Sequence, residues 1–193
     1  ELDAPRIVDA QKFLPEDIAA GKLSFVVKDI YEVDVEKDFN GLFDIIILKD
    51  VIENIQLKYP ESSIKIQSPK TEISIEADTF HFTNLVYNLL DNAIKYCEKK
   101  PEIVIGITEN GNQIQLNFTD NGIGISNKNL PFIFDKFYRI PSTKSNEVNG
   151  FGLGLYYVKK ICTLHHWKIS AKNNATQGIT ISILIPILNH IET

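Results

Sequence analysis

The sequence predicts a two-layer α/β sandwich, in which helices cover one face of a mixed, mostly antiparallel sheet. Two observations lead to this fold class. Amphipathic helical stretches are interleaved with short strand-like runs, and two pairs of these runs are joined by short turns, which makes each pair antiparallel. The 193 residues are 44% hydrophobic and 23% charged, which suits one globular domain with a sizeable core and a short attachment.

Residues 1–42 are predicted to be an N-terminal segment, and the domain itself is predicted over 43–193. Pro5 and Pro15 interrupt any long helix in the first 22 residues, and the run KLSFVVKDI at 22–30 alternates like a strand.

The first half of the domain alternates helices with strands. Asp44 and Asp78 stand where helix N-caps are expected, and Pro60 follows the end of the first helix. The predicted elements are a helix over 43–59, strands over 63–67 and 72–77, and a long helix over 79–99.

The second half contains two predicted hairpins separated by a glycine-rich stretch and a helix. Asn110-Gly111 is a strong hairpin turn signal, and residues 120–152 are rich in Gly, Asn and Ser, with one short helical patch after Pro131. The predicted elements are strands over 101–108 and 113–119, a helix over 153–166, and strands over 167–172 and 179–187.

The long helix has two chemically different sides. At about 100° per residue, Asn88, Asn92 and Lys95 fall within a sector of about 60°, roughly opposite an apolar stripe. Amide oxygens can ligate a hard cation such as Mg²⁺, and a lysine beside them suits phosphate oxygens. Taken alone, this pattern leaves an ordinary solvated face as an equal alternative.

The segment TDNGIGI at 119–125 follows directly on a strand. Gly122 and Gly124 allow a tight turn with close backbone approach, and Asp120 lies at the strand end. A carboxylate there can accept a hydrogen bond from an exocyclic amine such as adenine N6, whereas guanine presents an oxygen at that place. The alternative is a plain Asp-Asn-Gly turn.

Two further segments have chemical character. NGFGLGLYYVKK at 149–160 places spaced glycines before a helix, whose first N–H groups favour anions. It lacks the βαβ context of a dinucleotide-binding motif, and the GxxxxGK[ST] phosphate loop is absent from the sequence.

In LPFIFDKFYR at 130–139, we expect Phe132, Phe134 and Phe137 to pack a small lid against the body of the domain. Taken alone, this segment would be read as a surface helix with an apolar underside.

Together and in this order, the segments resemble the catalytic ATP-binding domain of sensor histidine kinases, in the Bergerat-type ATPase superfamily. NLLDNAIKY resembles the family's asparagine box, DNGIGI its first glycine box, IFDKFYR its phenylalanine box and GFGLGL its second glycine box. The resemblance covers about residues 43–187. More faintly, DIAAGKLSF at 17–25 resembles the tail of the dimerisation and phosphoacceptor helix that precedes the domain.

The resemblance implies ATP and Mg²⁺ as cofactors and a role for each matching residue. Asn92 matches the Mg²⁺ ligand, and Asn88 supports the metal and phosphate region. Lys95 matches a phosphate-contacting lysine, Tyr96 lies beside the nucleotide, and Arg139 matches an arginine near the γ-phosphate. The remaining matches are the adenine-reading Asp120 and the pocket, hinge and helix-start residues Gly122, Gly124, Gly150, Gly152, Gly154 and Leu155.

The resemblance further implies a mobile ATP lid over 125–149 and transfer of the γ-phosphoryl group to a histidine on a separate dimerisation domain. That phosphoryl group would pass to a response-regulator aspartate, and the parent protein would be a homodimer. None of the four histidines, His81, His165, His166 and His190, has a phosphoacceptor context. HHWKI at 165–169 departs from the family's histidine–glycine–glycine turn, and Phe151 stands where a small or hydroxyl residue is common.

Three other functions share these motifs. One is an ATPase whose product is conformational change, as in topoisomerase, mismatch-repair or chaperone relatives; another is a nucleotide-gated interaction module without phosphoryl transfer. A serine kinase that regulates a sigma factor also shares the boxes, although FDKFYR is less expected there.

Composition bears on the possible partners and the cellular location of the domain. The net charge of −5, without a Lys/Arg-rich block, argues against a nucleic-acid surface. The sequence has no apolar run of about 18 residues and no signal-peptide pattern, so we expect a cytoplasmic domain without membrane insertion, whether or not its parent is membrane-anchored. Cys97 and Cys162 are expected to be buried free thiols. The absence of Met suggests a piece of a longer or processed chain.

Overall fold

The computed structural model describes residues 42–68, 74–140 and 151–187, which lie within Gly41–Thr193, one of the two units of the chain. The strand predicted over 22–30 and the remainder of the N-terminal segment before residue 42 lie outside the described residues.

A five-stranded sheet forms one layer, with the strand order β2-β4-β5-β7-β6. β2 is parallel to β4, whereas every other neighbouring pair in this sheet is antiparallel. The predicted mixed, mostly antiparallel sheet is therefore confirmed. The strands are β2 (Ser63–Gln67), β4 (Glu102–Asn110), β5 (Gln113–Asp120), β6 (Lys168–Asn173) and β7 (Ile179–Pro186).

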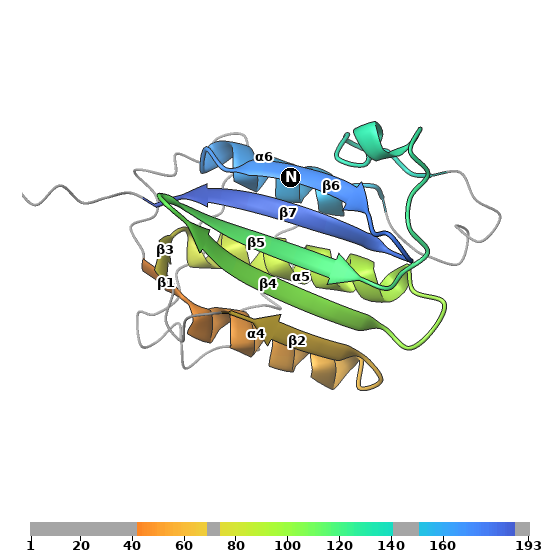
Figure 1. The fold of residues 1–193 in the computed structure, drawn as a ribbon, viewed down its shortest axis with the longest axis horizontal. Coiled ribbons are helices and arrows are strands. Elements are labelled where there is room, and N and C mark those ends of the chain that lie inside the picture. Colours follow the sequence, from red (N-terminus) through yellow and green to blue (C-terminus); the bar gives the residue numbers. More distant parts are fainter. Residues whose placement is uncertain (1–41, 69–73, 141–150, 188–193) are drawn as a thin grey trace, which may run out of the picture. The chain divides into compact units, whose positions relative to one another are not determined.

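Helices cover one face of this sheet, as predicted (Figure 1). The helices are α4 (Ile45–Lys58), α5 (Thr79–Lys95) and α6 (Gly154–Leu164), and a short 3₁₀ helix, η1 (Leu130–Phe132), follows the first glycine-rich turn. The central helix α5 packs against both α4 and α6. A separate pair of three-residue strands, β1 (Leu42–Asp44) and β3 (Ser74–Glu76), was not predicted as a pair, because β1 is too short to show an alternating pattern.

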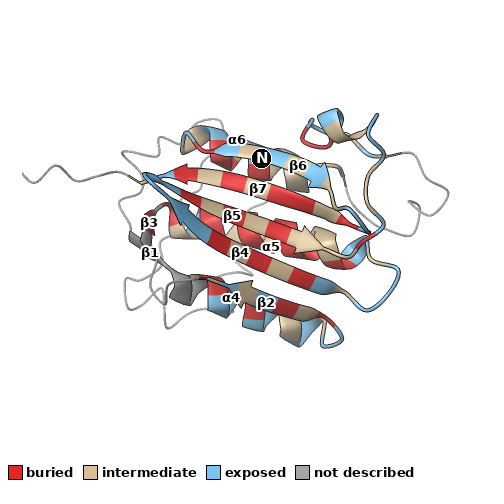
Figure 2. Cartoon of the chain, viewed as in Figure 1, coloured by how far each residue is buried: buried red, intermediate tan, exposed pale blue. Residues whose placement is uncertain are grey.

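The core lies between the two layers and follows the periodicity of each element. Inward positions alternate along β4 and β5, so buried and partly exposed residues form bands across the sheet (Figure 2). The helix side contributes Leu85, Val86 and Leu90, each 0% exposed. The inward strand residues are Ile103, Ile105, Ile107, Ile114, Leu116 and Phe118.

Local signals explain the helix ends. Asp78 is the N-cap of α5, as predicted, because its side chain accepts a hydrogen bond from the His81 N–H. The helix ends at Lys95 rather than residue 99, since Tyr96 has left helical geometry and the chain turns toward the sheet. α6 ends at Leu164 rather than residue 166, because His166 adopts a left-handed φ of 57°.

The two cysteines differ in their surroundings. Cys162 is completely buried on α6, as predicted, and burial raises its pKa to about 12. Cys97 is only partly buried, and its Sγ lies 3.2 Å from Asn121 Oδ1, so the prediction of a buried thiol was wrong there. Among the described residues, no helix combines the length and apolar character needed to cross a membrane.

Candidate functional site

The polar side of α5 faces the start of α6. Asn88 donates its Nδ2 to the Asn84 carbonyl oxygen at 2.8 Å, which leaves its amide oxygen directed away from that backbone. The first residue of α6, Gly154, lies so close that a Cβ atom there would stand 2.9 Å from Asn88 Oδ1 and 3.6 Å from Asn92 Nδ2. The structure therefore brings together three predicted site residues from two boxes that are far apart in sequence.

Lys95 lies on the same helix but contacts an acidic residue that the sequence reasoning missed. Its Nζ is 2.5 Å from Asp91 Oδ2, four residues earlier. Asp91 also accepts a hydrogen bond from the Tyr59 hydroxyl at 2.8 Å, and the Lys58 Nζ lies 3.6 Å away. The i, i+4 spacing of Asp91 and Lys95 was the available signal for this pair.

The surroundings of Asp91 act on its pKa in opposite directions. Burial alone would raise the pKa, but the hydrogen bonds from Lys95 and Tyr59 and the two nearby ammonium charges lower it below its ordinary value. The hydrogen bond to Asp91 in turn raises the pKa of Lys95, which remains a cation. Lys95 is therefore held in place by a buried anion at one edge of the polar face.

Asp120 ends β5 on the side of the sheet that the helices cover, because it shares a face with Phe118. Its Oδ1 accepts hydrogen bonds from the Gly122 N–H at 2.8 Å and the Ile179 N–H at 3.2 Å. No described residue bonds to its second carboxylate oxygen, Oδ2. Burial raises the pKa of this carboxyl group, although both N–H groups oppose the shift.

The first glycine turn lies against the C-terminal end of α5. The Ile123 N–H donates to the Tyr96 carbonyl oxygen at 3.0 Å, and a Cβ on Gly122 would stand 2.8 Å from the same oxygen. Gly124 has a left-handed φ of 73°. The side chain of Tyr96 is 44% exposed beside this junction. Glycine at 122 is thus required by close packing, and at 124 by conformation.

The second glycine box is joined to the phenylalanine segment. Gly152 has a φ of 69°, its carbonyl oxygen accepts from the Phe137 N–H at 3.0 Å, and a Cβ there would stand 2.7 Å from Phe137 C. Phe134 is buried as predicted, but Phe132 and Phe137 are 48% and 63% exposed, so the prediction that all three pack inward was wrong. Its neighbour Ile133 is also buried.

The structure also describes two further predicted site residues of this region. Arg139 is exposed at the end of the phenylalanine segment, and Leu155 is half-buried in the first turn of α6. Gly150 lies outside the described residues, as does the lid between 141 and 149.

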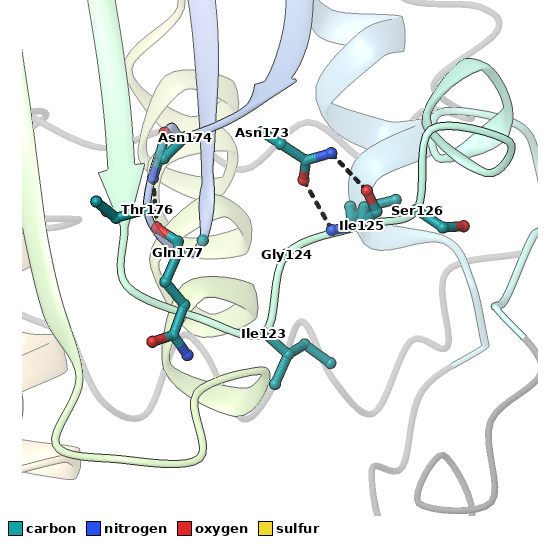
Figure 3. Close-up of a pocket in the computed structure, with 9 residues that line it drawn as sticks. Ile123, Gly124, Ile125, Ser126, Asn173, Asn174, Thr176 and Gln177 are labelled. Carbon is teal, nitrogen blue, oxygen red and sulfur yellow. Dashed lines mark hydrogen bonds between the residues drawn. The ribbon is translucent and has the colours of Figure 1, made fainter.

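A polar hollow of about 310 Å³ lies between the first glycine turn and the β6–β7 loop (Figure 3). Of the predicted site residues, only Gly124 lines it. Sequence reasoning missed Asn173 at the end of β6 and Asn174 and Gly178 in the loop, although the Asn-Asn pair was visible as a turn signal. Gly178 is required by packing, since a Cβ there would lie 2.0 Å from the Asp120 carbonyl oxygen.

The sandwich, the paired amides on α5 and the two glycine-rich junctions beside them define an ATP-binding domain. A family model described as "Histidine kinase-, DNA gyrase B-, and HSP90-like ATPase" matches residues 77–189. The chain belongs to this family, and its relatives include the sensor histidine kinase YkoH of Bacillus subtilis, which is 33% identical over 149 residues.

Individual relatives agree with this assignment. The sensor protein RprX of Bacteroides fragilis is 38% identical over 149 residues, which cover 75% of this chain and 28% of RprX. The solved mycobacterial sensor histidine kinase MprB has the same fold, with a TM-score of 0.67 at 21% identity over 77% of this chain and 97% of that one. Full-length ShkA, solved in complex with AMPPNP, gives a TM-score of 0.66 at 21% identity, covering 81% of this chain and 33% of ShkA. The chain spans less than a third of the length of the curated relatives RprX and YkoH.

Proposed function

We propose that this domain binds Mg-ATP and transfers the γ-phosphoryl group to a histidine on a separate dimerisation domain of the same protein. A response-regulator receiver domain then accepts the phosphoryl group on an aspartate. The observation that carries the proposal is the close approach of Gly154 to Asn88 and Asn92, which places the N-terminus of α6 against the amide face of α5.

The phosphate end of the site is assigned to α5 and α6. Asn92 is the Mg²⁺ ligand, with Asn88 supporting it, and Lys95 and Arg139 contact the phosphate oxygens. The amide positions suit a hard cation, because the Asn88 Nδ2 is already engaged with Asn84 and its oxygen is the group directed at the site. When bound, Mg²⁺ would neutralise charge on the phosphate oxygens.

The base end of the site is assigned to the first glycine turn. Asp120 reads the adenine amino group through its second carboxylate oxygen, while its first oxygen is held by two backbone N–H groups. Tyr96 lies beside the nucleotide, and Gly122 and Gly124 leave room for it. Gly150, Gly152, Gly154 and Leu155 form the hinge and the phosphate-facing start of α6.

The chain itself supplies the positioning and charge for the transfer rather than a base. The acceptor imidazole carries its own nucleophilic nitrogen, and phosphoryl transfer depends mainly on alignment and electrostatic stabilisation. Lys95 remains a cation, because the hydrogen bond to Asp91 raises the pKa of its ammonium group. We propose that the parent protein is a homodimer, with or without a membrane anchor, and that this domain works in the cytoplasm.

Radiolabelled ATP tests the proposal with the chain alone and with the dimerisation domain of its parent protein added. We expect acid-labile phosphate on the added dimerisation domain. This chain should not become stably labelled, because the γ-phosphate has no acceptor within reach until the dimerisation domain docks. ATP hydrolysis without phosphohistidine would favour a conformational ATPase, and nucleotide binding without turnover would favour an interaction module. Robust acid-labile labelling of the chain alone, lost on mutating one of its four histidines, would place the acceptor inside residues 1–193.

A further inference from the structure

The end of β6 carries two adjacent asparagines whose side chains are both committed to the first glycine turn. Asn173 is the last residue of β6, and Asn174 begins the loop to β7. The Asn173 side chain bonds to Ile125 at one end of the turn, and the Asn174 side chain bonds to Asp120 at the other end.

Asn173 forms a two-way contact with one residue of the turn. Its Oδ1 accepts from the Ile125 N–H at 2.9 Å, and its Nδ2 donates to the Ile125 carbonyl oxygen at 2.6 Å (Figure 3). The same Nδ2 lies 3.2 Å from Asn127 Oδ1. Both backbone groups of Ile125 are therefore satisfied by a single side chain, immediately after the left-handed Gly124.

Asn174 fixes the other end of the turn. Its Nδ2 donates to the Asp120 carbonyl oxygen at 2.8 Å and to the Gln177 carbonyl oxygen at 3.0 Å. Its Oδ1 accepts from the Thr180 hydroxyl at 2.7 Å, and that hydroxyl lies 3.0 Å from the hydroxyl of Thr119. The amide is thus held in one orientation by partners on β5 and β7.

We infer that Asn173 and Asn174 are positioning residues that hold the turn from Asp120 to Ile125 in its nucleotide-binding shape. Asn174 fixes the strand end from which Asp120 projects, and Asn173 fixes the residue that follows Gly124. This inference rests on the proposed function, since it assigns Asp120, Gly122 and Gly124 to the nucleotide. Neither asparagine needs to touch the nucleotide itself.

The geometry favours a role in binding over a role in global stability. The turn carries two glycines, whose backbone freedom must be restricted before a ligand can use their shape. Asn173 and Asn174 restrict it at Ile125 and Asp120, and the Asp120 carboxylate and the Tyr96 carbonyl oxygen hold Gly122 and Ile123. The Asn121 side chain is held separately, because it accepts from the Glu102 N–H and donates to the Lys100 carbonyl oxygen. The hydrophobic core lies elsewhere, between the inner face of the sheet and the helices.

Calorimetry with Mg-ATP and Mg-GTP tests this in the full chain and in the variants Asn173→Ala, Asn173→Asp and Asn174→Ala. Gln177→Ala is the matched control, because it removes an exposed amide from the same loop whose side chain has no bond with any described residue. Asn173→Asp preserves shape and the acceptor for the Ile125 N–H but removes the donor to its carbonyl oxygen.

We expect Asn173→Ala to raise the Kd for Mg-ATP about tenfold, because both hydrogen bonds to Ile125 are lost. Asn173→Asp loses only the donor to the Ile125 carbonyl oxygen, so its Kd should rise about fivefold. Asn174→Ala should reduce the preference for ATP over GTP, because the Asp120 backbone loses its hydrogen bond from Asn174. Amide exchange at Ile125 should become faster in Asn173→Ala, which removes the acceptor of its N–H. The control should match the wild-type chain in all three measurements.

An unchanged Kd in both Asn173 variants, alongside a lowered melting temperature, would overturn the inference and leave the pair a purely structural role. If the Ala variant fails to fold, the isosteric Asp variant still decides the matter. Failure of the proposed function has a different signature, since the wild-type chain would then bind neither nucleotide.

Discussion

The Cβ position of Gly154 stands 2.9 Å from the Asn88 side-chain oxygen, across the junction of α6 with α5. Real Cβ atoms rarely approach a neighbour this closely, so a side chain at 154 must displace the amide. The second glycine box is therefore glycine at this position because of the asparagine box. A substitution at Gly154 should therefore change the position of the Asn88 side chain and, with it, the affinity for nucleotide.

Gly154→Ala should weaken nucleotide binding more than folding. Overpacking costs about 1–3 kcal/mol, but the helical propensity of Ala returns up to about 1 kcal/mol, so the melting temperature should change little. The affinity for Mg-ATP should fall about tenfold or more, because the Asn88 side chain beside Asn92 is displaced. Gly106→Ala is the control, since its Cβ would meet only Asn117 Cβ at 3.8 Å. Equal loss of binding in the control would argue against this account.

Asp120→Asn should reduce the preference for ATP over GTP. The substitution keeps an oxygen that can accept from the Gly122 and Ile179 N–H groups, but it replaces the second oxygen with a donor. An acceptor left facing the wrong base edge costs about 1–3 kcal/mol, so the wild-type chain should bind GTP at least about fivefold more weakly than ATP. Calorimetry with both nucleotides measures this. Equal affinities in the wild-type chain would remove Asp120 from the adenine-reading role.

Asn92→Ala should abolish Mg²⁺-dependent nucleotide binding while the fold persists. Asn92 is half-buried on the polar side of α5, and Ala is the better helix former, so the melting temperature should hold or rise slightly. Thermal melting combined with titrations of ATP, with and without Mg²⁺, separates the two effects. Unfolding of the variant would instead make Asn92 a structural residue.

Asp91→Asn should flatten the dependence of stability on pH in acid. The pKa of Asp91 is lower in the folded chain than its ordinary value of 3.8, so its ionisation stabilises the fold above that value. This contribution is lost as pH falls through the lowered folded pKa. At pH 7 the variant should be less stable by about 1–3 kcal/mol, because Tyr59 and Lys95 lose a charged acceptor.

Urea unfolding at pH values from 7 down to 3 measures the effect of Asp91. Asp50→Asn, at an exposed position of α4, serves as the control and should follow the wild-type curve. A variant curve parallel to that of the wild type over the whole range would show that the Asp91 charge does not contribute.

Thiol labelling of the folded chain should reach one cysteine and spare the other. Cys97 is partly exposed, whereas Cys162 is completely buried with its pKa raised to about 12. Ellman's reagent should therefore release one equivalent quickly, and the second only after unfolding in denaturant. Cys97→Ser should eliminate the fast phase. Two fast equivalents in the native chain would contradict the burial of Cys162.

Periodicity and capping were sufficient to predict most of the fold. The inward face of α5, the Asp78 cap and both hairpins follow from local spacing, because each depends on residues close together in sequence. The end of α5 at Lys95 could not be predicted in this way. It depends on Ile123, which bonds to the Tyr96 carbonyl oxygen from a distant turn.

In the candidate site too, local sequence signals were predictable and contacts between distant residues were not. Asn88, Asn92 and Asp120 were singled out because their residue types and spacing are unusual for a solvated surface. Asp91 was not, because its burial requires Tyr59 of the α4 region to lie beside it. Asn173 and Asn174 were missed for a similar reason, since their partners are about 50 residues away along the chain. The exposure of Phe132 and Phe137 likewise depends on tertiary packing, which an apolar pattern does not reveal.

β5 pairs directly with β7, so the sheet does not depend on how long the chain between these two strands is. Thr119 is paired with Thr180, so the 60 intervening residues form an excursion whose two ends are held together by the ladder. Each doubling of a flexible loop costs only about 0.6 kcal/mol in closure entropy. Residues inserted or deleted between Arg139 and Phe151 should therefore leave the sheet intact. The segment between these two residues can thus diversify in length among related chains while the sheet and its covering helices stay the same.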